Sequence, residues 1–159
     1  MSNIEVSGKI QKKYKDLAKN VASQVINFMK QPDVLEVAIE FVSEKEIQRL
    51  NREIRGIDKV TDVLSFPATN LSVGEILDEF GEDVLFLKTE DGNIHFGDMA
   101  ICFAQTERQA KEYGVSVESE IKKLVIHSML HLMGYDHIED SDYEIMNPKE
   151  IELDKLIKI

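Results

Sequence analysis

The chain has 159 residues, 43% hydrophobic and 31% charged, which is typical of one globular domain with a substantial core. The net charge of −11 argues against a uniformly basic nucleic-acid-binding surface, and the single cysteine, Cys102, excludes an internal disulfide framework. The sequence has neither a run of about 18 apolar residues nor an apolar N-terminal stretch of signal-peptide length. We therefore expect a cytoplasmic protein without a membrane span.

The charge is distributed unevenly along the chain. Residues 1–60 carry a net charge of +2, whereas residues 61–159 carry −13. Basic side chains gather near residues 9–19 and again near residues 49–59, which is the pattern of a solvated helix face or a modest anion-binding patch. Charge alone therefore does not decide whether the partner is a nucleic acid.

The first half of the chain alternates between strand and helix patterns. Period-two alternation or β-branched runs predict strands, and apolar residues one helical turn apart predict helices. The helix that begins after Ser43 carries Glu46 at the third position, as in a capping box. The predicted elements are a strand at 3–6, a helix at 9–29, a strand at 35–42, a helix at 44–54 and a strand at 61–66.

The second half begins with an acidic stretch, residues 69–93, which we expect to be an exposed excursion with a short strand at 84–88. A strand at 94–101 and a helix at 104–113 follow, and a helix capped by Ser116 runs to about residue 133. A last helix, at 141–157, is expected to be interrupted near Pro148. Because helices and strands are mixed without strict alternation, residues 1–159 predict one α+β domain, a small mixed β-sheet packed with helices.

Three histidines in eleven residues are the most informative feature of the chain. His127 and His131 are spaced to lie on one helix face, one turn apart. Gly134 can adopt the left-handed conformation that ends a helix, and the reversed chain can then bring His137 back to the first two imidazoles. Three imidazoles around one point form a tetrahedral metal site with one open position, so we predict a zincin-like metal-binding helix.

A lone histidine on an apolar helix face is more often a packed or surface residue than a ligand. The third histidine, placed just past a helix-ending glycine, shifts the balance to a metal site. Imidazole ligands with an open position favour Zn²⁺, although Ni²⁺ or another divalent ion would fit the same ligands.

The residue after the first histidine, Ser128, separates this site from that of metalloproteases. In the protease motif H-E-x-x-H-x-x-G-x-x-H, a glutamate at this position is the general base. A serine hydroxyl cannot perform that task near neutral pH. The spacing of the ligands is retained, but the group needed for peptide hydrolysis is missing.

Three blocks of the sequence resemble the bacterial YbeY family of metal-dependent endoribonucleases. The first is His127 to His137, where the family carries a small residue at the position of Ser128. The second is Leu-Asn-Arg-Glu-Ile-Arg at 50–55, followed by Thr-Asp-Val-Leu-Ser-Phe-Pro at 61–67. The third is Gly-Asp-Met-Ala-Ile at 97–101. The blocks occur in the family's order and span roughly residues 35–155, and the acidic stretch after Pro67 is longer than is usual in the family.

The resemblance implies a zinc-dependent, single-strand-specific endoribonuclease that matures the 3′ end of small-subunit (16S) rRNA and takes part in ribosome quality control. Its implied partners are single-stranded rRNA precursors and the ribosome or its small subunit. It implies Arg55 and His127 as catalytic residues and His127, His131 and His137 as ligands of one Zn²⁺ ion. The guanidinium of Arg55 suits a catalytic role because it can hold a phosphate bidentately and stabilise charge in a phosphoryl transition state.

Three aspartates are candidates for an orienting group or a base. Asp136 precedes a predicted ligand and can accept the second N–H of an imidazole. Asp62 and Asp98 lie in the family blocks, where each could equally cap a strand or stabilise a turn. The attacking group is left open between water and the RNA 2′-hydroxyl, with Glu139 and Asp140 as further nearby bases.

Two other functions remain open from the sequence. One is a zinc-dependent peptidase or amidase whose base comes from elsewhere in the chain. The other is a non-enzymatic, metal-stabilised module for ribosome assembly.

Overall fold

The computed structural model describes residues 3–136 and 140–159. The strands are β1 (Asn3–Gly8), β2 (Leu35–Val42), β3 (Val63–Pro67) and β4 (Ile94–Cys102). The helices are α1 (Lys12–Phe28), α2 (Glu44–Arg55), α3 (Phe103–Tyr113), α4 (Val117–Leu132) and α5 (Asp140–Leu156), with the 3-10 helix η1 (Glu82–Leu87) before β4.

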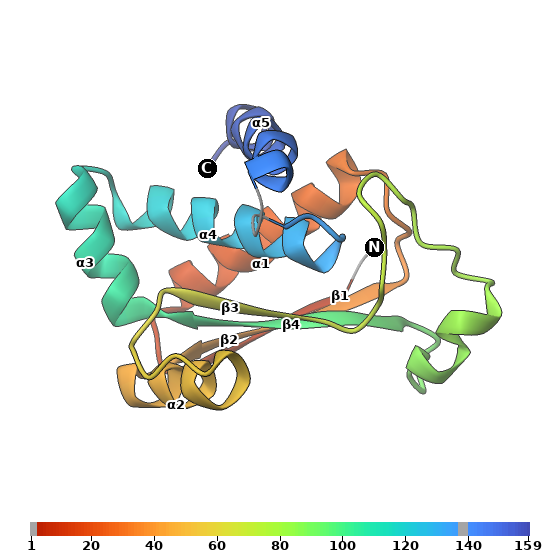
Figure 1. Ribbon diagram of the computed structural model, residues 1–159, viewed down its shortest axis with the longest axis horizontal. Coiled ribbons are helices and arrows are strands. Elements are labelled where there is room, and N and C mark those ends of the chain that lie inside the picture. Colours follow the sequence, from red (N-terminus) through yellow and green to blue (C-terminus); the bar gives the residue numbers. More distant parts are fainter. Residues whose placement is uncertain (1–2, 137–139) are drawn as a thin grey trace.

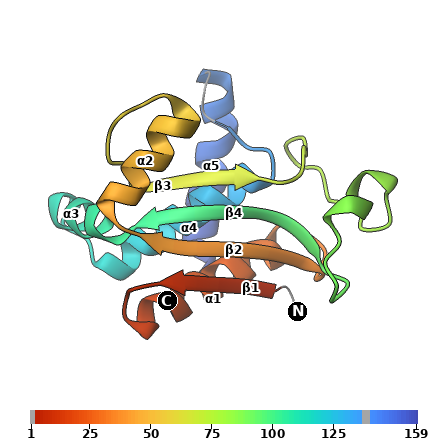
Figure 2. The same cartoon turned by 90° about the horizontal axis from the view of Figure 1, so that it is seen from below.

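A four-stranded mixed sheet in the order β1-β2-β4-β3 lies at the centre of the fold (Figure 1). Strands β1, β2 and β4 are parallel, and β3 runs antiparallel to β4 at one edge. Helices α1 and α4 cover one face of the sheet, and α5 lies across the outside of α4. Helix α2 lies on the opposite face, over β3 and β4 (Figure 2). This single α+β domain confirms the predicted fold class.

The apolar pattern of the sequence accounts for this layering. In β2, the alternate residues Leu35, Val37, Ile39 and Phe41 are buried, facing α1 and α4. Helix α4 is buried around most of its circumference because it lies between the sheet and α5. The helix that carries the two histidines is therefore one of the most deeply embedded elements of the protein.

The predicted helix starts are confirmed by their caps. Ser43 Oγ accepts a hydrogen bond from Glu46 N (3.1 Å), and Ser116 Oγ accepts one from Ser119 N (3.0 Å). The Glu46 carboxylate binds Arg49, so only one half of the expected capping box is formed as predicted.

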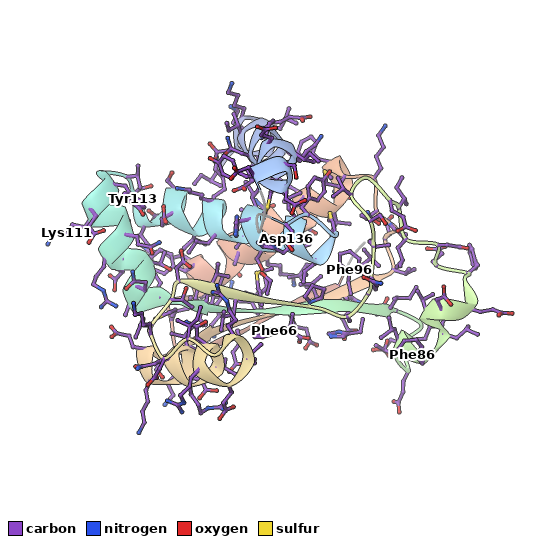
Figure 3. The ribbon with its side chains drawn as sticks, viewed as in Figure 1. Phe66, Phe86, Phe96, Lys111, Tyr113 and Asp136 are labelled. Atoms are coloured by element: carbon purple, nitrogen blue, oxygen red, sulfur yellow. The ribbon has the colours of Figure 1, made fainter. Side chains whose placement is uncertain are left out.

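The strand predicted at 84–88 is wrong, because most of this segment is η1. Only its last residue, Lys88, pairs with the sheet, through an isolated antiparallel bridge to Ile94 at the start of β4. Within η1, Val84 packs into the core, whereas Phe86 is 80% exposed at the outer end of the acidic segment (Figure 3).

The interruption predicted near Pro148 is also wrong. Helix α5 continues through this residue, and the buried side chains of Met146 and Leu153 anchor it on both sides of the proline. Among the helices of the described residues, none has both the length and the apolar character required to cross a bilayer.

Candidate active site

Helix α4 brings His127 and His131 together on one face, near its C-terminal end. Their rings are nearly perpendicular, at 83°, with centroids 4.6 Å apart. The two Nε2 atoms are 3.1 Å apart. Two nitrogen ligands of a tetrahedral Zn²⁺ ion, each about 2.0–2.1 Å from the metal, would be separated by about 3.3 Å. The pair therefore has the spacing of two ligands of one ion.

The other ring nitrogens are held by acceptors. His131 Nδ1 lies 2.9 Å from the carbonyl oxygen of Tyr135, which can only accept a hydrogen bond. His127 Nδ1 lies 3.3 Å from Glu150 Oε2 on α5. A proton on Nδ1 of each ring would satisfy both contacts and give each Nε2 the lone pair that a metal ligand needs. The chemistry of this donor set fits a cation.

The predicted turn after α4 is confirmed at Gly134, whose φ is +96°. Its N–H donates to His131 O (3.1 Å), and Tyr135 N donates to Leu130 O (3.0 Å), which closes the end of the helix. A Cβ at Gly134 would also collide with the backbone of Leu71. Glycine is therefore required for two reasons, its positive φ and the close approach of the backbone at Leu71.

The predicted third ligand, His137, and the nearby base candidate Glu139 lie outside the described residues. Within residues 3–136 and 140–159, the structure has no group of three or more His, Cys, Asp or Glu side chains placed to hold a metal ion. The described part of the site thus supplies two nitrogen ligands and the turn that leads toward the third.

The histidines open into a cleft of about 590 Å³. One side of this cleft is formed by β3 and the chain that follows it, and another by the end of α2, where Arg55 is exposed. The C-terminal turn of α4 forms the rest, including Asp136, which Figure 3 shows beside the end of that helix on the helical side of the sheet. The fold therefore brings Arg55, His127, His131 and Asp136 to one cleft.

Ser128 is fully buried and does not line this cleft. Its hydroxyl lies 2.7 Å from the hydroxyl of Ser65 on β3, so the two side chains join α4 to the edge of the sheet. The position that carries the base in metalloproteases is occupied here by a packing contact.

The structure does not bring Asp62 or Asp98 to the cleft lining. Asp62 caps the start of β3 by accepting from Val63 N (2.7 Å), and its second oxygen accepts from Gln109 Nε2 (3.1 Å). Asp98 pairs with His95 (2.9 Å) and lines a hollow on the sheet face that carries α2. Both carboxylates therefore have structural partners away from His127 and His131.

Glu150 is a site residue that the sequence analysis missed. It lies 23 positions after the histidine that it contacts. Its one signal in the sequence is periodic: it falls on the stripe of α5 that contains the buried residues Met146 and Leu153 and is continued by Ile157 just after the helix. A charged residue in an apolar stripe indicates a specific partner, but the pattern does not reveal which one.

Comparison with known proteins identifies the family of this chain. A family model described as Endoribonuclease YbeY matches residues 1–158. The chain belongs to the YbeY family. Proteins named Endoribonuclease YbeY are 42% identical in Clostridium acetobutylicum, over 74% of this chain and 72% of that protein, and 39% identical in Clostridium kluyveri, over 84% and 85%. The one from Thermoanaerobacter pseudethanolicus is 39% identical over 87% of this chain and 84% of its own length.

A solved structure supports the fold as well. The solution structure of a Thermotoga maritima protein matches with a TM-score of 0.61 and 27% identity, covering 96% of this chain and 87% of that chain. The match extends over nearly the whole chain. Membership in the YbeY family, predicted from the three sequence blocks, is confirmed, and with it the assignment of the chain to a family of endoribonucleases.

Proposed function

We propose that this chain is a Zn²⁺-dependent endoribonuclease that cleaves single-stranded RNA in the maturation of small-subunit rRNA. The observation that carries the proposal is the facing pair of Nε2 atoms, 3.1 Å apart, in the same cleft as Arg55. His127 and His131 would hold the ion together with His137. When bound, Zn²⁺ supplies Lewis acidity toward a phosphate oxygen at this position.

The protein's own groups supply the remaining requirements. Arg55 stands at the rim of the cleft, where its guanidinium can bind a phosphate through two N–H groups and balance the charge that develops during transfer. Asp136 lines the same cleft and is the described carboxylate that can accept a proton from the attacking group. If the attacking group is the RNA 2′-hydroxyl, the product carries a 2′,3′-cyclic phosphate, whereas attack by water leaves a 5′-phosphate on the other fragment.

The peptidase alternative has less support. Ser128 is fully buried and engaged with Ser65, so the protease position offers the cleft neither a carboxylate nor room for one. An arginine at the rim also suits a phosphodiester better than a peptide bond.

The place of action follows from the proposed substrate. Precursors of ribosomal RNA and the small ribosomal subunit are cytoplasmic in bacteria, and a single reduced cysteine suits that compartment. The −13 charge of residues 61–159 would repel RNA phosphates from most of the surface and favour entry of a single strand at the cleft.

The test is cleavage of a defined single-stranded RNA by wild type, Arg55→Ala and His131→Ala, with metal content measured in each preparation. Wild type should cleave and contain about one Zn²⁺ per chain. His131→Ala should lose both properties, and Arg55→Ala should keep the metal but lose most of the cleavage. Equal cleavage by the three identically purified proteins would identify a contaminating nuclease and overturn the proposal. Chelator-sensitive cleavage of peptides without cleavage of RNA would support the peptidase instead.

A further inference from the structure

We propose that Glu150 is a positioning residue that sets the tautomer of His127 and so prepares the histidine pair for a cation. The inference rests on the metal site proposed above and extends it to α5, which no sequence motif connects to the site. It starts from one contact, the 3.3 Å separation between Glu150 Oε2 and His127 Nδ1.

Glu150 lies on the inward face of α5. Met146, Leu153 and Ile157 lie on the same helical stripe and are no more than 1% exposed. Lys122 fastens the end of the helix by donating to Asp154 O (2.9 Å) and Ile157 O (3.0 Å). These contacts hold α5 against α4, so Glu150 extends from a fixed position on the helix.

A carboxylate at such a position is costly unless it is paired. The side chain of Glu150 is 20% exposed and that of His127 is 26% exposed, so both groups have lost most of their contact with water. The apolar stripe alone would favour leucine at this position. The choice of a charged residue therefore points to a role that packing does not explain.

The contact selects between two forms of the His127 ring. With the proton on Nδ1, the ring donates to Glu150, and its Nε2, 3.1 Å from that of His131, carries the lone pair that a metal ligand needs. With the proton on Nε2, the ring could donate to His131 across 3.1 Å but could not bind a metal ion through that nitrogen. That second form places the Nδ1 lone pair against the carboxylate, so Glu150 disfavours it.

The two histidines differ in this respect. The acceptor for His131 is the backbone carbonyl of Tyr135, which no side-chain substitution removes. The tautomer of His127 depends on a side chain from another helix. The packing of α5 against α4 is therefore coupled to the tautomer of His127, and through it to the affinity of the site for a cation.

The experiment compares the full-length wild type with Glu150→Ala, Glu150→Leu and the control Glu152→Gln. Glu152 lies on the same helix, is 55% exposed and pairs with Lys149. Zn²⁺ affinity is measured by competition with a chromophoric chelator. The tautomer of His127 is read from the imidazole ¹⁵N shifts of the metal-free proteins at alkaline pH, where the ring is neutral.

We expect both Glu150 variants to bind Zn²⁺ about 10–100-fold more weakly than wild type, as for other groups that orient a metal ligand. Their metal-free forms should shift His127 toward the Nε2–H tautomer, and the Glu152 control should behave as wild type. Glu150→Leu completes the apolar stripe, so its metal-free form should melt at or above the wild-type temperature while its affinity falls. If Glu150 had a purely structural role, its replacement by leucine would not lower the Zn²⁺ affinity while the melting temperature stays the same or rises.

Unchanged affinity and tautomer in Glu150→Leu would overturn the inference, and this variant decides the matter if Glu150→Ala fails to fold. Failure of the underlying function gives a different result. In that case wild type would bind Zn²⁺ no better than His131→Ala, whatever residue stands at position 150.

Discussion

The hydroxyls of Ser65 and Ser128 lie 2.7 Å apart and join the edge strand β3 to helix α4 beneath the cleft. Because Ser128 is fully buried, any larger or charged side chain at this position must displace the strand that forms the cleft wall.

We predict that Ser128→Glu lowers the free energy of unfolding by about 3 kcal/mol or more, since it places a carboxylate in this buried contact. Ser128→Ala should cost only about 1 kcal/mol, the net value of one hydrogen bond. Denaturant unfolding of both variants provides the measurement. A stable Ser128→Glu protein with chelator-sensitive peptidase activity would revive the protease alternative.

Arg55 is expected to act on the reaction and not on metal binding. Arg55→Ala should reduce kcat for RNA cleavage by about 10²–10³-fold, the loss typical of removing one donor to a developing oxyanion. Arg55→Lys should recover part of this, because a lysine retains the charge but not the two-pronged contact. Arg52→Ala is the matched control, since Arg52 lies in the same helix turn but pairs with Asp58 (3.3 Å). Loss of zinc in Arg55→Ala would contradict this division of roles.

Gly134→Ala should destabilise the protein by about 2–4 kcal/mol, which combines the cost of a positive φ with the collision against the Leu71 backbone. Gly74→Ala separates the cost of the positive φ from the cost of the collision. Gly74 has a φ of +81° and open space around its Cβ position, so it should lose only about 1 kcal/mol. Chemical unfolding in the presence of a chelator measures both without a contribution from metal. Equal losses would show that the contact with Leu71 is unimportant.

Pro148 interrupts the hydrogen-bond ladder of α5 without breaking the helix. Pro148→Ala should therefore raise the free energy of unfolding by about 1–2 kcal/mol, because it restores an N–H donor and removes a steric conflict, partly offset by a more flexible unfolded chain. Asn147→Ala should gain only a few tenths of a kcal/mol. A lower melting temperature for Pro148→Ala would mean that the proline fixes a local geometry that the fold needs.

Cys102 should be unreactive in the folded protein. Burial raises the pKa of its thiol above the ordinary value, so the reactive thiolate is disfavoured. Because the folded-state pKa is raised, the associated stability is present at neutral pH and is lost as the pH rises through the thiol's titration range. Alkylation by iodoacetamide should be at least about tenfold slower in the native than in the denatured protein. Equal rates would show that the β4–α3 junction opens readily.

The sequence by itself determined the local features of this protein. Period-two alternation located β2, and hydroxyl caps at Ser43 and Ser116 located the starts of α2 and α4. The spacing of His127 and His131 placed them on one face, because the repeat of an α-helix fixes that relationship without help from the rest of the fold. The same local logic predicted the reversal at Gly134. Three sequence blocks were sufficient to predict the family.

The tertiary structure alone decided which distant groups meet. Whether a short apolar run becomes a strand depends on the pairing that the fold offers it, and of residues 84–88 only Lys88 pairs with β4, in a single bridge to Ile94. Asp62 and Asp98 lie in the sequence blocks of the family, but their positions just before β3 and on β4 bring them to Gln109 and His95 and not to the cleft. Glu150 reaches His127 only because α5 packs across α4. No sequence motif relates the two residues, because their contact depends on how the two helices pack.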